Sequence, residues 1–219
     1  MKYYKRLREE KASCLTLKYY NTISLPHYSG ILDEVEQLNL DWIAASNPLS
    51  AHQICLNAAP GYTHDVTFGA GYFADKGKSD FFIRISPDGD ERIPMSPKSV
   101  YDWELCDVFK GTKIADAYHA LESKYSIGRV RLLKSQPYTC MNWHIDPIPR
   151  VHYPIQTDEA CLMIIEDEVY HLPLEQWTFA HTHKGKHTAL NASNINRIHL
   201  VADILPTRVT NPYSCKGYP

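Results

Sequence analysis

The stretch WTFAHTHKGKHTALNASNINRIHLVADIL, residues 177–205, contains three short β-forming segments joined by turn-forming residues. The joining residues KGK and NASN are rich in glycine, asparagine and serine, which favour turns. In the last segment, RIHLVADIL, the side chains of Arg197, His199 and Asp203 fall on one face of a strand, because successive side chains alternate. The stretch therefore predicts successive antiparallel strands.

The same pattern of short strand-forming segments separated by turns begins upstream, at Arg129. The segments RVRLLKS, RVHYPIQ, CLMIIE and VYHLPL are short and often alternating, and turn-forming residues such as EDE separate them. Many short strands at this spacing are typical of an antiparallel sandwich or barrel. We therefore expect a β-rich half over residues 125–205, followed by a C-terminal tail over residues 206–219.

The N-terminal half, residues 1–124, has a different pattern. ILDEVEQLNLDWIAAS, residues 31–46, shows roughly helical spacing of its apolar residues, and the Asn-Pro pair that follows would end a helix. IADAYHALESKYS, residues 114–126, predicts a second helix, and DFFIRIS, residues 80–86, predicts a strand. A chain of 219 residues suits one domain, in which this half supplies support and substrate-binding elements.

Composition excludes several classes of protein. The net charge of −2 gives no basic footprint for nucleic acid or for an anionic membrane surface. The sequence has no run of eighteen apolar residues, and its start, MKYYKRLREEKASC, lacks the apolar core of a signal peptide. The six cysteines are dispersed, without a CxxC pair, so we expect free thiols and a cytoplasmic protein.

A candidate metal site begins in WHIDPIPRVHYPI, residues 143–155, where His144 and Asp146 form an H-x-D pair. On a strand both side chains would point to one face, so both could reach one ion. One further histidine would complete two imidazoles and a carboxylate, a ligand set that leaves positions open on Fe(II). The competing interpretation is a surface histidine beside an aspartate that precedes Pro147.

Arg197 suggests a second component of the same site. An arginine that points into a barrel is costly to bury without an anion, and its planar guanidinium matches a carboxylate. A salt bridge with Asp203 would be the ordinary alternative. Arg150 and His152 place two more basic groups on one strand face soon after the H-x-D pair. A metal triad among cationic side chains fits 2-oxoglutarate, whose 2-oxo acid end can chelate iron while its far carboxylate meets Arg197.

Four motifs together resemble one family of enzymes. H-x-D at 144–146, R-x-H-x-P-I at 150–155, H-x-x-x-N at 187–191 and R-I-H-L-x-x-D at 197–203 resemble the aspartyl/asparaginyl β-hydroxylases and the related bacterial proline hydroxylases. These are Fe(II)/2-oxoglutarate oxygenases, and the resemblance covers about residues 125–205. It implies a mainly β protein, a double-stranded β-helix or jelly roll with its site at the open mouth, here flanked by N-terminal helices.

The resemblance also implies a role for each matching residue. His144, Asp146 and His187 resemble the iron ligands, and Arg197 resembles the arginine that binds the far carboxylate of 2-oxoglutarate. The next two matches, Arg150 and His152, resemble residues that contact the same cosubstrate; we interpret the matching asparagine and aspartate, Asn191 and Asp203, as structural.

The third ligand is chosen from the three histidines of HTHKGKH, residues 181–187. Arg197 follows His187 by ten residues, which favours His187 and leaves His183 as the alternative. Some aspartyl/asparaginyl hydroxylases lack the carboxylate ligand. The presence of Asp146 therefore draws this chain toward the proline-hydroxylase-like branch.

The expected function is hydroxylation of an unactivated C–H bond with Fe(II), 2-oxoglutarate and O2, on a free amino acid or another small polar molecule. A peptidyl Asp, Asn or Pro is the alternative substrate. Two other classes compete with this function: a zinc hydrolase or cupin-type metalloenzyme that uses the same three ligands, and a jelly-roll binding module without catalysis. The other metalloenzyme would not need a buried arginine ten residues after the third ligand, and metal content would distinguish the binding module.

Overall fold

The computed structural model describes residues 17–44, 52–68, 71–73, 81–84, 91–94 and 103–205. For residues 43–44, 71–73, 81–84 and 91–94 it describes the backbone alone. The elements of the N-terminal half are β1 (Tyr20–Thr22), α2 (Ile31–Gln37), β2 (Ile43–Ala44), β3 (His52–Cys55), β4 (Asn57–Ala58), β5 (Gly71–Phe73), β6 (Phe81–Arg84), β7 (Glu91–Pro94), β8 (Glu104–Leu105), η2 (Asp107–Phe109) and α3 (Lys113–Glu122).

Eight strands then follow one another in the C-terminal half. They are β9 (Ile127–Ser135), β10 (Thr139–Cys140), β11 (Arg150–Gln156), β12 (Cys161–Ile165), β13 (Glu168–Tyr170), β14 (Thr178–Ala180), β15 (His187–Asn191) and β16 (Arg197–Ile204). All of them except β10 overlap segments predicted from the sequence, although β13 and β14 are shorter than the predicted segments.

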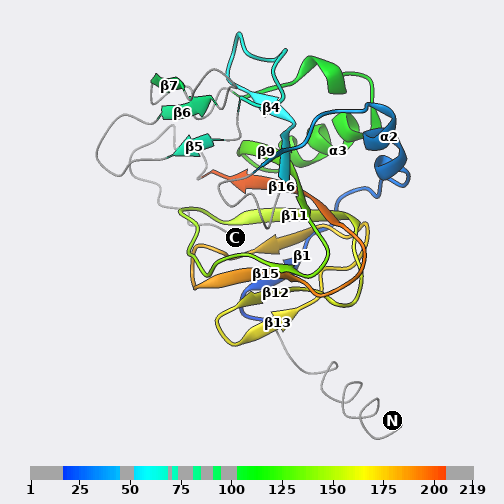
Figure 1. Cartoon of the computed structure of the whole chain (residues 1–219), viewed down its shortest axis with the longest axis vertical. Helices are drawn as coiled ribbons and strands as arrows, with labels where there is room; N and C mark the ends of the chain where they lie inside the picture. Colours follow the sequence, from blue (N-terminus) through cyan, green and yellow to red (C-terminus); the bar gives the residue numbers. More distant parts are fainter. Residues whose placement is uncertain are drawn as a thin grey trace, which may run out of the picture.

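The order of these strands identifies the fold. A seven-stranded sheet has the order β1-β14-β11-β16-β9-β3-β2, and a four-stranded sheet has the order β10-β15-β12-β13, all with antiparallel pairs. The chain therefore passes between two facing sheets as it runs from β9 to β16 (Figure 1). Two interleaved Greek keys of this kind form a jelly roll. The predicted double-stranded β-helix is confirmed.

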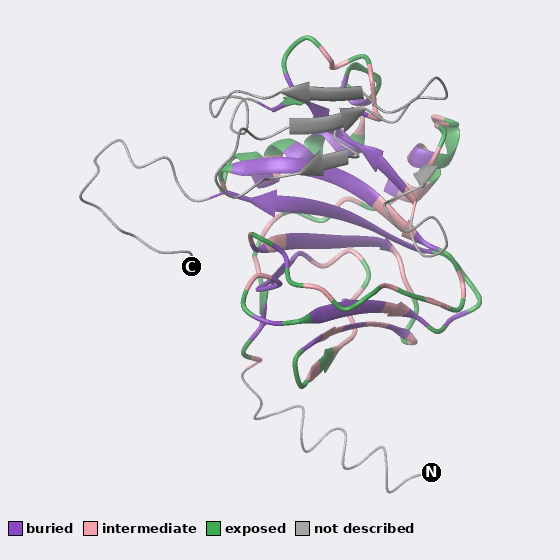
Figure 2. Cartoon of the chain, turned by 60° about the vertical axis from the view of Figure 1, so that its left-hand side comes forward, coloured by how far each residue is buried: buried purple, intermediate pink, exposed green. Residues whose placement is uncertain are grey.

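The two helices cover the outer face of the larger sheet, on the side away from the four-stranded sheet (Figure 1). The core there contains Tyr118 and Leu121 of α3 together with Leu132 of β9 and Leu200 of β16, all fully buried. The strands of the larger sheet are buried along most of their length, as Figure 2 shows in purple. This apolar layer fixes the sheet, so its opposite face is free to carry polar groups.

The first predicted helix is much shorter than expected. The sequence pattern predicted a helix over residues 31–46, but α2 ends at Gln37, Asn39 has a positive φ of 45°, and residues 43–44 pair with β3. Tertiary pairing thus overrides helical spacing. The second helix begins one residue before the predicted start and ends at Glu122. The carboxylate of Glu34 accepts hydrogen bonds from the backbone N–H groups of Lys113 and Ile114, which joins the two helices.

Asn191 fixes the turn between β15 and β16. Its Nδ2 donates to the carbonyl oxygens of Ser135 (3.1 Å), Gln136 (3.0 Å) and Ile195 (2.8 Å), and its Oδ1 accepts from the backbone N–H and the hydroxyl of Ser193. The side chain is fully buried, and its bonds tie the end of β9 to this turn. The contacts support the structural role that we inferred for this residue.

Two further sequence predictions bear on the described residues. Four cysteines are free thiols, at positions 55, 106, 140 and 161, whereas Cys14 and Cys215 lie outside the described residues. Within the described part of the chain, no helix is both long enough and apolar enough to cross a membrane.

Candidate metal centre

His144, Asp146 and His187 converge at one point. Each offers a ligand atom, and these atoms lie within 4.8 Å of one another. His144 and His187 form an isolated antiparallel bridge, in which each backbone N–H donates to the other's carbonyl oxygen at 3.1 and 2.8 Å. The backbone N–H of Asp146 donates to the carbonyl of Thr182 at 3.2 Å. Backbone pairing therefore brings the three side chains together, although the H-x-D segment forms a single bridge and not a continuous strand.

The carboxylate of Asp146 lies at the centre of a polar cluster. Its Oδ2 is 3.2 Å from Nε2 of His187, its Oδ1 is 3.7 Å from Nε2 of His144, and Nη2 of Arg150 lies 2.6 Å from the same Oδ1. Burial alone would raise the pKa of Asp146, but the Arg150 guanidinium and His187 hold it well below its ordinary value. This favours the carboxylate form of Asp146, which is the form that can bind a metal ion.

The two imidazoles present their Nε2 atoms to the carboxylate. Nδ1 of His144 lies 2.8 Å from the carbonyl oxygen of Asn142, and this contact fixes the ring so that Nε2 is left for an ion. Burial lowers the pKa of His144, which favours the neutral form that binds metals. His187 is buried on β15, and the two rings lie with their centroids 4.1 Å apart.

Arg150 is committed to carboxylates of the protein. Besides its contact with Asp146, its Nε lies 3.2 Å from Oδ1 of Asp203, and Oδ2 of Asp203 lies 3.4 Å from Nε of Arg129. Asp203 is therefore shared by two arginines, neither of which is Arg197. Arg150 thereby holds Asp146 in place, and its predicted contact with the cosubstrate stays a prediction.

Arg197 is the buried, uncompensated arginine that the sequence predicted. It is 4% exposed, and its Nη2 has no hydrogen-bond partner among the described residues. Burial lowers its pKa to about 10. The ordinary alternative, a salt bridge with Asp203, is wrong, because the Asp203 carboxylate contacts Arg129 and Arg150 instead.

His152 and His199 lie between the metal ligands and Arg197. Both imidazoles are buried, and none of their four ring nitrogens has a hydrogen-bond partner in the described structure. Their rings meet edge to face with centroids 5.9 Å apart. Burial lowers the pKa of each well below its ordinary value, and the charge of Arg197 acts in the same direction. The interior thus carries two neutral imidazoles that have no hydrogen-bond partner within the described ranges of the chain.

The other histidines of HTHKGKH lie outside the triad. Nε2 of His181 accepts a hydrogen bond from Nδ2 of Asn21 at 3.1 Å when the ring is neutral, and burial lowers its pKa to about 4. His183 packs against His181 with ring centroids 5.7 Å apart and is not part of the convergent group. Of the two candidates for the third ligand, the structure therefore brings His187 to the site.

Sequence reasoning missed two residues of the interior. Arg131 lies on β9, opposite Val201 of β16, so its side chain is on the same face as His199 and Asp203. Its Nη1 donates to Oε1 of Gln53 on β3 at 3.1 Å. The alternation of RVRLLKS could have placed Arg131 on this face, but nothing in the sequence pointed to Gln53.

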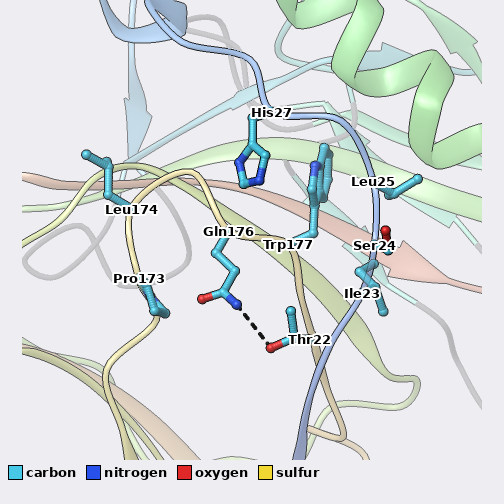
Figure 3. Close-up of a pocket in the computed structure, with 9 residues that line it drawn as sticks. All are labelled: Thr22, Ile23, Ser24, Leu25, His27, Pro173, Leu174, Gln176 and Trp177. Carbon is cyan, nitrogen blue, oxygen red and sulfur yellow. Dashed lines mark hydrogen bonds between the residues drawn. The ribbon is translucent and has the colours of Figure 1, made fainter.

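A separate cavity lies at the opposite end of β14. Its volume is about 530 Å³, and its lining includes His27, Gln176 and Trp177 (Figure 3). Nε2 of Gln176 donates to the hydroxyl of Thr22 across it. Trp177 precedes β14, whereas Thr182, which bonds to Asp146, follows that strand. The cavity is therefore not part of the metal centre.

Comparison with known proteins gave limited similarity. No protein-family model matches the sequence, and no curated protein matches it. Several solved structures resemble it, of which three are described. The first is a cupin domain from Bordetella pertussis Tohama I, with a TM-score of 0.30, 17% identity, and coverage of 36% of this chain and 81% of that one.

The second is an oxidoreductase of the 2OG-Fe(II) oxygenase family from Burkholderia pseudomallei, with a TM-score of 0.42, 9% identity and coverage of 79% and 76%. The third is the viral collagen prolyl hydroxylase of Paramecium bursaria Chlorella virus-1 in its 2OG complex, with a TM-score of 0.39, 11% identity and coverage of 85% and 95%. These values are low, so the strand order remains the basis for the fold. The resemblance to the aspartyl/asparaginyl β-hydroxylase family stays a prediction.

Proposed function

We propose that the chain is an Fe(II)- and 2-oxoglutarate-dependent oxygenase that hydroxylates an unactivated C–H bond of a free amino acid or another small polar molecule. The observation that carries the proposal is the pairing of two features in one barrel. His144, Asp146 and His187 offer a convergent ligand set, and Arg197 is a buried cation whose Nη2 has no partner among the described residues.

The ligand set fits a ferrous ion. Two imidazole nitrogens and one carboxylate oxygen suit Fe(II) and leave coordination positions for a chelating molecule and for O2. The three atoms already lie within 4.8 Å of one another, and two of the side chains are almost fully buried. Contacts from the protein orient the donors: the Asn142 carbonyl holds His144, and Arg150 holds Asp146.

The interior also fits the cosubstrate. Buried polar groups are normally hydrogen-bonded, and each exception calls for an explanation. Here Nη2 of Arg197, both nitrogens of His152 and both nitrogens of His199 have no partner among the described residues. A diacid such as 2-oxoglutarate would supply acceptors to this cluster and a counter-charge to Arg197. A zinc hydrolase with the same three ligands has no use for that arginine.

The residues then have distinct tasks. Bound iron and 2-oxoglutarate would supply the oxidising chemistry that activates O2 toward a C–H bond. His144, Asp146 and His187 would hold the metal, and Arg197 would bind the far carboxylate of the diacid. Arg150 keeps Asp146 ionised and oriented.

The test is an anaerobic titration of the purified protein with Fe(II), with and without 2-oxoglutarate. We expect a weak visible charge-transfer band that needs both components, and we expect succinate to form once air is admitted. An Arg197→Met variant should still bind Fe(II) but should need far more 2-oxoglutarate for the band. A wild-type protein that binds no Fe(II), or that binds it and gives no band with 2-oxoglutarate, would refute the proposal.

A further inference from the structure

Arg131 is a second buried arginine with unsatisfied donors, apart from Arg197. It is 7% exposed, and its Nε and Nη2 have no hydrogen-bond partner in the described part of the chain. Its position opposite Val201, which in turn pairs with His152, puts it on the inner face of the larger sheet. Neighbouring strands lie about 4.8 Å apart, so the Cα atoms of Arg131 and His152 are roughly 10 Å apart.

The guanidinium of Arg131 is held in one orientation. Gln53 is 2% exposed on β3, and its Oε1 accepts from Nη1 of Arg131 at 3.1 Å. The two remaining nitrogens, Nε and Nη2, form the side-on edge of the guanidinium. That edge carries two parallel N–H groups, the geometry that matches both oxygens of a carboxylate. The protein therefore holds one edge of this group and leaves the carboxylate-binding edge without a partner.

The charges around Arg131 call for an anion. The cluster contains three arginines, at positions 129, 131 and 150, but two carboxylates, Asp146 and Asp203. Asp203 lies within salt-bridge distance of Arg129 and Arg150, and no ion pair joins it to Arg131 in the described structure. A metal ion bound by Asp146 would add further positive charge. A buried cation in this setting is costly unless an anion accompanies it.

Arg131 and Arg197 lie at separate positions along the inner face of the larger sheet. Arg131 is level with Val201 on β16, and Arg197 is four residues away along the same strand. At about 3.3 Å per residue, the two positions are separated by roughly 13 Å. If Arg197 binds the far carboxylate of 2-oxoglutarate, the free edge of Arg131 is available to a second anion at a different position in the barrel.

We infer that Arg131 binds the free carboxylate of the substrate, so that the substrate is a free amino acid rather than a residue within a peptide. This inference rests on the proposed oxygenase function. Gln53 positions the guanidinium, and Arg131 is then a specificity-determining residue. The amino acid would span the interval between Arg131 and the metal ligands, and its side chain would face the open metal positions.

The test compares free amino acids with their carboxamides. The probe is a panel of the twenty proteinogenic amino acids and the matching amides, which lack the negative charge. Binding is followed by the rise in Tm of the protein loaded with redox-inert Mn(II) and 2-oxoglutarate, and turnover is followed by succinate release with Fe(II). We expect at least one amino acid to raise Tm and stimulate succinate release, and its amide to do neither.

The matched variants are Arg131→Met and Lys134→Met. Both remove one cation from β9, but Lys134 lies on the other face, over the Trp42 ring at 4.2 Å. Arg131→Met should raise the KM for the amino acid roughly 30-fold or more, since it removes two charge-assisted hydrogen bonds. The affinity for 2-oxoglutarate should stay at the wild-type value. Lys134→Met should resemble the wild type in both.

Several results would overturn the inference. The first is an amide, or a residue within a peptide, that serves as substrate as well as the free amino acid. The second is an Arg131→Met protein whose KM for the amino acid is unchanged. The third is a loss of 2-oxoglutarate affinity in that variant as large as its loss of amino-acid affinity. A wild-type protein that gives the 2-oxoglutarate band but responds to no member of the panel would also overturn it. If Arg131→Met does not fold, Arg131→Lys keeps the charge but lacks the two parallel N–H groups, and it should raise the KM for the amino acid. Absence of the band in the wild type would instead refute the oxygenase function.

Discussion

Replacing Arg197 with methionine should stabilise the metal-free protein while weakening 2-oxoglutarate binding. The arginine is 4% exposed, and burial lowers its pKa to about 10 from an ordinary value of 12.5. At about 1.4 kcal/mol per pKa unit, this corresponds to roughly 3 kcal/mol of cost for the charged form. Methionine is flexible, unbranched and uncharged, so it can fill much of the same space. We expect the free energy of unfolding to rise by about 1–3 kcal/mol.

The assay is urea unfolding of the metal-free protein, followed by tryptophan fluorescence and by circular dichroism. A chain of this size gains about 2–4 °C in Tm per kcal/mol, so the thermal midpoint should rise by several degrees. The same substitution removes charge-assisted hydrogen bonds worth about 1.5–3 kcal/mol each from the bound diacid. The Kd for 2-oxoglutarate should therefore rise roughly 100-fold, while Fe(II) affinity should change little.

Lys124→Met is the control, because Lys124 is an exposed cation on the helical side of the domain. It should leave both the unfolding free energy and the 2-oxoglutarate affinity nearly unchanged. The reasoning fails if Arg197→Met lowers the stability of the metal-free protein by more than about 1 kcal/mol, because the arginine would then have a structural partner. It also fails if 2-oxoglutarate binds to the variant as tightly as to the wild type.

Three further predictions concern other parts of the molecule. Asp146→Ala should lower Fe(II) affinity at least 100-fold, and a His144→Ala, His187→Ala double variant should retain no iron after gel filtration; wild-type iron content in either would contradict the assignment. Asn191→Ala leaves several buried backbone groups without partners and should cost about 3–5 kcal/mol in urea unfolding, whereas a loss below about 1 kcal/mol would count against its role. Burial lowers the pKa of His181 to about 4, below the ordinary 6.5, so the unfolded state takes up more protons between these pH values. The Tm should therefore fall as pH drops from 6.5 to 4, and His181→Gln should make that fall less steep. An unchanged dependence of Tm on pH in the variant would contradict the argument.

The sequence was most informative where a pattern repeats along the chain. Alternation placed Arg197, His199 and Asp203 on one face of a strand, and β16 has them there. Turn residues divided the C-terminal half into strands close to those in the structure. The convergence of His144 and His187 was also expected, because two separated segments each offered ligands to one mouth of a barrel.

The sequence was least informative where the outcome depends on partners far along the chain. Residues 31–46 have helical spacing, but pairing of β2 with β3 takes the last of them into a sheet. The contact of Arg150 with Asp203 was not predicted, because the two residues are remote in sequence and the pairing of β11 with β16 brings them together. Arg131 was not singled out for the same reason: its significance depends on which neighbouring carboxylates are already engaged.

The backbone bridge between His144 and His187 means that a bound metal ion would also stabilise the fold. These residues are 43 positions apart in the sequence, yet each accepts a hydrogen bond from the other's amide. A divalent ion held by both imidazoles would cross-link the same two points and close that loop a second time. Fixing a loop of this length removes several kcal/mol of freedom from the unfolded chain, in the way that a disulfide does. Removing the ion with a chelator should therefore destabilise the segment between β10 and β15 as well as stop turnover. The ion would act as a reversible cross-link between His144 and His187.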